Sequence, residues 1–162
     1  KMNTKEKVKE WDEVLDSYEN SIGFPKYNEC LINEKELNEY FSMDRNVIEK
    51  LSPEDTAQIS YRLSQFAFHI QRTLNREIAR HNWAEETIKE TIADELNSYK
   101  GYGYVEKYYQ AVKHNEAAQS LNKIKKYAKQ RMDRLSYTAN SIKNLSDILM
   151  AINRNKNKNG HQ

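Results

Sequence analysis

The sequence contains few of the residues that make turns. Four glycines and two prolines occur among 162 residues, about 4% where an average protein has roughly 12%. Hairpin-rich β architectures depend on glycine at tight turns, and dinucleotide-binding folds depend on glycine-rich loops. Both classes are therefore nearly excluded, and the sequence predicts an all-helical protein.

Cysteine and long apolar runs are also scarce. Cys30 is the single cysteine, which excludes an intrachain disulfide framework and a cluster of thiolate metal ligands. No apolar run approaches the roughly 20 residues of a membrane-spanning helix, and the first residues are rich in lysine and glutamate, unlike a signal peptide. We expect a soluble cytoplasmic protein that is not secreted and does not bind membranes.

The apolar content is low for the core of a monomer. Apolar residues make up 38% of the chain and the mean hydropathy is −1.01, values that are normal for long helices which bury only one stripe. Two such helices in a single hairpin cannot cover both stripes. The N-terminal helices, other copies of the chain, or both must supply the missing surface, and we expect a homo-oligomer.

Helix signals divide the chain into three parts. Residues 1–51 contain candidate N-caps at Thr4, Asn33 and Asp44, each followed by a short amphipathic pattern, and predict an arm of short helices. Ser52-Pro53 is the clearest helix start in the sequence, because a hydroxyl cap precedes a proline at the first helical position. From Ile59 to Tyr99 apolar residues recur at a mean of about 3.6, which predicts one long helix.

The predicted turn at about residues 100–103 contains Gly101 and Gly103, and a second long helix is expected to follow, ending near Ile152. The two helices then form an antiparallel hairpin over residues 52–153, and residues 154–162 read as a flexible tail. Apolar residues of the second helix repeat every seven residues, which is typical of coiled-coil packing. The predicted oligomer or core seam comprises Leu121, Ile124, Ala128, Leu135, Ile142, Leu145, Leu149 and Ile152.

Residues with the spacing of catalytic or metal sites are missing. The four histidines include no pair of ligands four residues apart, and no serine lies in a glycine elbow. We therefore predict that the protein is not an enzyme and uses no cofactor or metal. Glu77 and His81 interrupt the apolar stripe of the first long helix and are expected to approach Arg131. This polar layer either sets the helix register or takes part in ligand binding or proton transfer.

Positive charge is concentrated late in the chain. Residues 100–162 have 13 basic and four acidic side chains, a net charge of +9, whereas the earlier parts are mildly acidic. Six of the cations lie between residues 123 and 134. A block of one sign indicates an anionic partner, most simply a nucleic-acid backbone, although a plain basic coiled-coil surface, a membrane or an acidic protein are alternatives. The block comprises Lys123, Lys125, Lys126, Lys129, Arg131 and Arg134.

Two further patterns are compatible with nucleic-acid binding. Arg72, Arg76 and Arg80 recur every four residues and predict an exposed ladder, which either contacts phosphates or pairs with acids such as Glu77 and Glu85. Tyrosines and lysines cluster at the glycine turn, where they either stack on unpaired bases or pack on the N-terminal helices or a neighbouring subunit. The turn residues are Tyr99, Lys100, Tyr102, Tyr104, Lys107, Tyr108 and Tyr109.

The order of these features resembles the UvsY-type recombination mediators of tailed phages over roughly residues 52–153. The resemblance lies in the acidic start, the long helix, the stop at Tyr99, Gly101 and Gly103, and the final helix rich in leucine, isoleucine and lysine. It implies an all-helical, ring-like homo-oligomer that binds single-stranded DNA and helps to load a RecA-like recombinase in place of single-strand-binding protein. For a phage-encoded protein the expected location is the host cytoplasm.

When the glycine turns are aligned, the apolar positions of the family correspond to Ile92 and Leu96. The family's pair of basic residues corresponds to Ala93 and Glu95, which are not basic. The predicted contacts therefore lie in the 123–134 block and the turn, and secondarily in the arginine ladder. We expect a single-stranded nucleic-acid-binding oligomer, most specifically a recombination mediator, with RNA left open as a ligand. The alternative is a structural or assembly protein, such as a small terminase subunit or a helical oligomer of a virion or scaffold.

Overall fold

The computed structural model describes residues 3–23 and 32–160, so Cys30 lies outside the described residues. Over these ranges the chain forms only helices and no strand, which confirms the all-helical prediction. The elements are α1 (Thr4–Ser21), α2 (Glu34–Ser42), α3 (Arg45–Lys50), α4 (Pro53–Ile92), the short 3-10 helix η1 (Leu96–Ser98), α5 (Tyr104–His114), α6 (Glu116–Leu135) and α7 (Thr138–Asn159).

The chain divides into two compact units. The first unit combines residues 1–26 with residues 76–132, and the second combines residues 27–75 with residues 133–162. Helix α4 therefore contributes its later part to the first unit and its earlier part to the second. Each unit has its own buried apolar cluster.

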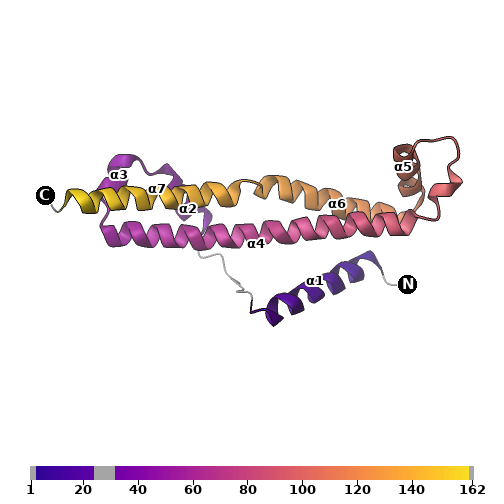
Figure 1. Cartoon of the computed structure of the whole chain (residues 1–162), viewed down its shortest axis with the longest axis horizontal. Coiled ribbons are helices and arrows are strands. Elements are labelled where there is room, and N and C mark those ends of the chain that lie inside the picture. The colour runs from indigo at the N-terminus through magenta and orange to yellow at the C-terminus, as the bar shows by residue number, and fades with distance from the viewer. Residues whose placement is uncertain (1–2, 24–31, 161–162) are drawn as a thin grey trace. The chain divides into compact units, whose positions relative to one another are not determined.

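In the first unit, α6 runs beside the later part of α4, and η1 and α5 close one end of this pair (Figure 1). Ile88 and Ile92 of α4 are fully buried against α5 and α6, and Tyr99 and Tyr108 pack on the margin of this core. The buried residues of the cluster are Ile88, Ile92, Ala111, Val112, Ala118 and Leu121.

In the second unit, α7 runs beside the earlier part of α4, and α3 packs on α7 (Figure 1). A buried serine cluster joins the two long helices: the Oγ atom of Ser146 lies 2.7 Å from Ser60 Oγ and 2.9 Å from Ser64 Oγ. The Lys156 ammonium donates to the backbone carbonyls of Ile48 and Leu51 at the end of α3. The buried apolar residues of the cluster are Ile32, Ile48, Leu63, Ala67, Ile142 and Leu149.

Helix α4 begins where the sequence predicts. The backbone N–H of Asp55 donates to Ser52 Oγ at 3.0 Å, and Pro53 occupies the first helical position. The predicted continuation to Tyr99 is wrong, because α4 ends at Ile92. Near this end the hydroxyls of Thr87 and Thr91 donate to carbonyls four residues earlier, a local bond that competes with regular helix geometry.

The predicted second long helix is also wrong as a continuous element, because it is divided into α5, α6 and α7. Asn115 has extended backbone angles, and its side chain accepts a 3.0 Å hydrogen bond from the N–H of Ala118, so that it caps α6. The same side chain donates to Glu95 Oε1 at 2.7 Å. Tyr137 separates α6 from α7 with a left-handed φ of 68°.

Despite these interruptions, the residues of the seven-residue repeat are buried or partly buried within the chain itself. Leu121 and Ala128 are buried in the first unit, and Ile142 and Leu149 are buried in the second. Ile124, Leu135, Leu145 and Ile152 are partly buried. The seven-residue repeat therefore reports contacts within one chain, and self-association stays a prediction that needs a different surface.

Candidate nucleic-acid interface

The basic block lies on α6, which presents part of it to solvent. Lys123 and Lys126 are exposed, and among the described residues neither side chain has a carboxylate partner. Lys125 differs, because its Nζ lies 3.4 Å from Glu85 Oε1 and 5.9 Å from the centre of the Tyr108 ring. Lys129 is exposed on a neighbouring side of α6.

An exposed tyrosine, which the charge pattern of the sequence did not indicate, lies among these cations. Tyr127 is 58% exposed and follows Lys123 by four residues, so that both side chains lie on the same side of α6. Gln130 continues this side and is also exposed. We call Lys123, Lys126, Tyr127 and Gln130 the α6 basic face. Their positions opposite the buried residues Leu121 and Ala128 were the signal that could have identified Tyr127 from the sequence.

Arg134 occupies the last turn of α6 and belongs to the second unit. Its side chain is exposed, while its backbone carbonyl accepts a 3.1 Å hydrogen bond from Thr138 Oγ1. The structure thus presents this predicted contact residue to solvent.

The tyrosine turn is divided between the solvent and the core. Tyr102, Tyr104 and Tyr109 are 53%, 62% and 67% exposed, as a base-stacking surface requires. Tyr99 and Tyr108 instead pack on the apolar cluster of the first unit, and the Tyr99 hydroxyl lies 3.2 Å from His114 Nδ1. Of the two predicted lysines, Lys100 is exposed and Lys107 is half-buried.

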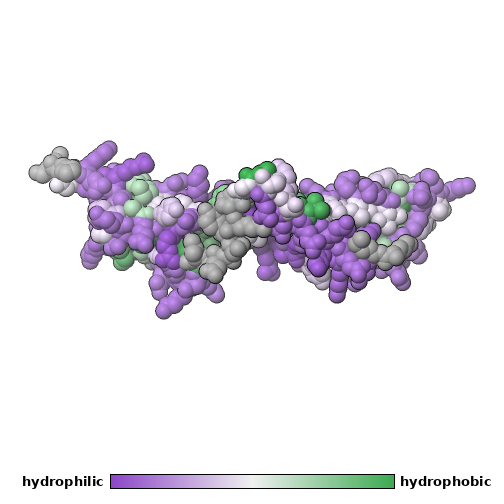
Figure 2. All heavy atoms as spheres, turned by 90° about the horizontal axis from the view of Figure 1, so that it is seen from below, coloured by the Kyte–Doolittle hydropathy of each residue, from purple (hydrophilic) through white to green (hydrophobic). Residues whose placement is uncertain are grey.

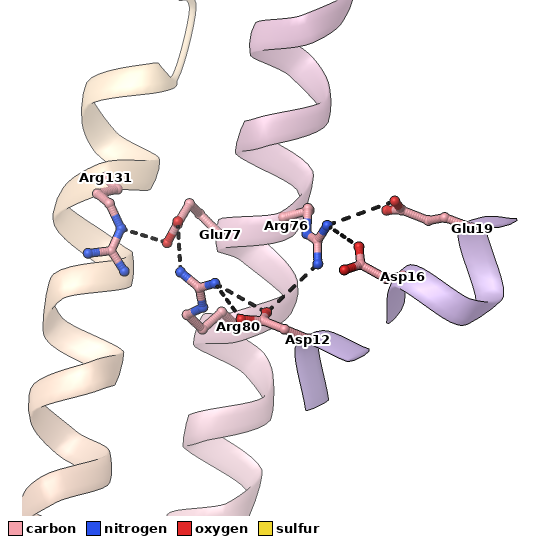
Figure 3. A network of polar contacts seen from close by, with 7 residues as sticks. All are labelled: Asp12, Asp16, Glu19, Arg76, Glu77, Arg80 and Arg131. Carbon is pink, nitrogen blue, oxygen red and sulfur yellow. Dashed lines mark hydrogen bonds and ion pairs between the residues drawn. The ribbon is translucent and has the colours of Figure 1, made fainter. Parts of the chain in front are cut away.

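The arginine ladder is not the exposed row that the sequence predicts. The side chains of Arg76 and Arg80 are only 25% and 22% exposed, and Arg72 is half-buried. Figure 3 shows that acidic residues of α1 lie against Arg76 and Arg80. The alternative interpretation, in which the arginines pair with acids, is confirmed for these two residues, although most of their partners come from α1.

The pairing with α1 involves three carboxylates. Arg76 lies 2.8 Å from Asp16 Oδ1, 3.8 Å from Asp12 Oδ1 and 3.9 Å from Glu19 Oε2, and Arg80 lies 3.2 Å from Asp12 Oδ1. Burial by itself lowers the pKa of Arg76, but the hydrogen bond to Asp16 and the surrounding negative charges raise the pKa above its ordinary value. Arg76 is therefore a permanent cation in this network.

The predicted approach of Glu77 to Arg131 is confirmed. Glu77 is 8% exposed, with one carboxylate oxygen 2.8 Å from Arg131 Nε and the other 3.1 Å from Arg80 Nη1 (Figure 3). His81 does not join this layer, because its ring lies at the surface, 3.3 Å from Asn82 Oδ1. Arg80 takes the place predicted for His81 as the partner of Glu77 on its own helix.

The face of the molecule shown in Figure 2 is predominantly hydrophilic, and its hydrophobic residues form small, separate patches. Within residues 3–23 and 32–160, no helix combines the length and apolar character needed to cross a membrane. Comparisons with protein-family models, with curated proteins and with solved structures found no match. The exposed cations and tyrosines are therefore the features on which a functional interpretation rests.

Proposed function

We propose that this protein binds single-stranded nucleic acid through the α6 basic face. The observation that carries the proposal is the exposed aromatic ring of Tyr127, which lies one helical turn after Lys123 and directly follows Lys126 in α6. The ammonium groups of these two lysines have no carboxylate partner among the described residues. Ammonium groups attract phosphates, and a neighbouring aromatic ring stacks on bases.

An unpaired strand fits this surface better than a duplex does. The flat faces of bases are accessible in a single strand, whereas they are stacked on one another inside a double helix. Stacking on an aromatic side chain is tolerant of sequence, because every base has such a face. Tyr102 and Tyr104, which are exposed in the same unit, provide two more rings of the same kind.

A narrower form of the proposal is a recombination mediator. The resemblance to the UvsY-type family supports it, and assembly into a homo-oligomer would multiply weak sites along one strand and raise avidity. The expected partners in that case are a RecA-like recombinase and a single-strand-binding protein. Cytoplasmic location belongs to the same proposal.

An assembly protein is the second candidate. Val105 and Tyr109 of α5 are 63% and 67% exposed, and exposed apolar side chains that lie close together favour a protein partner. In that case the tyrosines at the glycine turn serve as protein contacts, and any nucleic acid bound is a duplex with defined sites.

Binding to a short fluorescent oligothymidylate, measured by anisotropy at about 50 mM and about 200 mM salt, tests the main proposal. The double variant Lys123→Glu/Lys126→Glu is expected to lose binding. The matched control is Lys35→Glu/Lys50→Glu, which changes the net charge equally at two exposed lysines of the second unit.

The control should bind like the unmodified protein, and circular dichroism should show the same helicity for both variants. Equal losses in both variants would indicate a response to net charge alone and would contradict the assignment to α6. Light scattering with and without the oligonucleotide measures the number of copies. Binding of a defined duplex in preference to oligothymidylate would favour the assembly protein.

A further inference from the structure

Helix α1 places a row of negative charge on the arginines of α4. Asp12, Asp16 and Glu19 are spaced by four and three residues and therefore project from one side of α1. Figure 3 shows all three side chains directed at Arg76 and Arg80. An acidic helix thus occupies two guanidinium groups that would otherwise be available to an anionic ligand.

The attachment of α1 combines ion pairs with half-buried apolar side chains, those of Val8, Trp11 and Leu15. None of its residues is buried, and Val14 and Tyr18 on its outer side are 62% and 61% exposed. The aromatic contact to α4 is a tilted pair of rings, Trp11 and Trp83, with centres 5.9 Å apart. Because ion pairs at partly exposed sites contribute little and weaken with salt, α1 is held far less firmly than the core helices.

The surface beneath α1 is strongly basic. Arg80 and Arg131 both contact the carboxylate of Glu77, whereas the ion pairs of Arg76 are with carboxylates of α1. Without α1 the three guanidinium groups of Arg76, Arg80 and Arg131 and the Glu77 carboxylate together have a net charge of +2. Arg131 is 46% exposed and lies on α6, the helix that also bears the basic face, so the covered surface belongs to the same unit as the proposed binding surface.

We propose that Arg76 and Arg80 form a second phosphate-binding site and that α1 covers this site with carboxylates in place of phosphates. Guanidinium groups bind carboxylates and phosphates with the same paired N–H geometry. A bound strand that extends from the α6 basic face onto α4 therefore competes with Asp12 and Asp16 for the same donors. The inference rests on the proposed function and adds to it an inhibitory role for α1.

Removal of the competing charges tests the proposal. In Asp12→Asn/Asp16→Asn, oligothymidylate is expected to bind several-fold more tightly, with a steeper salt dependence. Two additional phosphate contacts make the plot of log affinity against log salt steeper, so that the magnitude of its negative slope increases by about 1.4 for a single strand. The matched control is Glu10→Gln/Glu13→Gln, which gives the same change in net charge at two exposed residues of the same helix.

A third variant identifies the donors. Arg76→Gln/Arg80→Gln should change the affinity of the unmodified protein little, because the phosphate contacts that these arginines gain on binding are offset by the contacts with α1 that they lose. Combined with Asp12→Asn/Asp16→Asn, the same change should abolish the gain in affinity and return the salt slope to its original value. Equal affinities for the α1 variant and its control would overturn the proposal.

The tryptophans report the displacement of α1 directly. Trp11 and Trp83 are the two tryptophans of the chain, and they contact each other across the α1–α4 contact. Oligothymidylate should therefore increase the quenching of tryptophan fluorescence by acrylamide in the unmodified protein. Stacking of bases on these rings would instead decrease the quenching, and decreased or unchanged quenching at saturating oligonucleotide contradicts displacement.

The outcomes separate the two proposals. If the unmodified protein binds but neither the α1 variant nor the fluorescence responds, the α6 proposal stands and the inhibitory role of α1 is wrong. If the unmodified protein fails to bind and the α1 variant binds, the covered site is supported and the α6 basic face is insufficient alone. If neither protein binds at low salt, both proposals are wrong.

Discussion

Arg131 of α6 and Glu77 of α4 are joined by an ion pair, with 2.8 Å between Arg131 Nε and Glu77 Oε2. The pair has an asymmetric environment, because the Glu77 side chain is 10% exposed and the Arg131 side chain is 46% exposed. It also continues into the α1 contacts, since the other carboxylate oxygen of Glu77 accepts a hydrogen bond from Arg80. One buried carboxylate therefore connects the basic helix, the long helix and the acidic helix of the first unit.

The asymmetry predicts unequal costs for removing the two partners. Glu77→Ala leaves Arg80 and Arg131 repelling each other beside the core and is expected to lower the free energy of unfolding by about 2–3 kcal/mol. Arg131→Ala leaves Glu77 paired with Arg80 and should cost about 1 kcal/mol. Urea denaturation followed by circular dichroism measures both values. Equal losses of unfolding free energy in the two variants would contradict this asymmetry and would show that both partners behave as buried charges.

Tyr127→Ala is expected to weaken oligothymidylate binding without destabilising the fold. Loss of one aromatic stacking partner costs about 1–3 kcal/mol per base, which corresponds to a drop in affinity of roughly 5- to 150-fold. Tyr61→Ala is a matched control, because Tyr61 is a similarly exposed tyrosine, 64% accessible, in the second unit. Anisotropy measures the affinity, and a similar loss in both variants would contradict a specific role for Tyr127.

Tyr137→Gly distinguishes the observed helix break from a continuous helix. Tyr137 has a φ of 68° and is 79% exposed, so that glycine would relieve backbone strain at little cost in side-chain packing. We expect the free energy of unfolding to rise by up to about 1 kcal/mol. In an uninterrupted helix the same change would lower it by about 0.5 kcal/mol. The sign of the change in urea midpoint decides between the two.

The raised pKa of Tyr40 predicts that the protein loses stability at alkaline pH. Burial and a 2.5 Å hydrogen bond from its hydroxyl to Glu36 Oε1 raise the pKa of Tyr40 above its ordinary value. A tyrosine whose pKa is raised in the folded state stabilises the fold below about pH 10, where the same residue is still protonated in the unfolded chain. This stabilisation is lost as the pH rises through the pKa of the folded state. The urea midpoint should therefore fall more steeply above about pH 10 for the unmodified protein than for Tyr40→Phe.

Local patterns in the sequence were sufficient for the helical class and for several helix boundaries. Scarcity of glycine and proline excluded turn-rich folds, and Ser52 and Pro53 marked the start of α4 because a hydroxyl cap and an N-terminal proline act within one helical turn. The seven-residue repeat located buried positions such as Leu121 and Leu149. These signals depend on neighbours along the chain, and they are therefore visible without tertiary information.

Tertiary structure decided which of those positions face solvent and where the long helices end. The cap made by Asn115 is strengthened by Glu95, a residue 20 positions away, and the left-handed Tyr137 interrupts a pattern whose apolar spacing continues unchanged. The arginine ladder looked exposed because helical periodicity describes one helix at a time. Its covering carboxylates belong to α1, some 60 residues earlier in the chain, and charge pairing over that separation depends on how the helices pack.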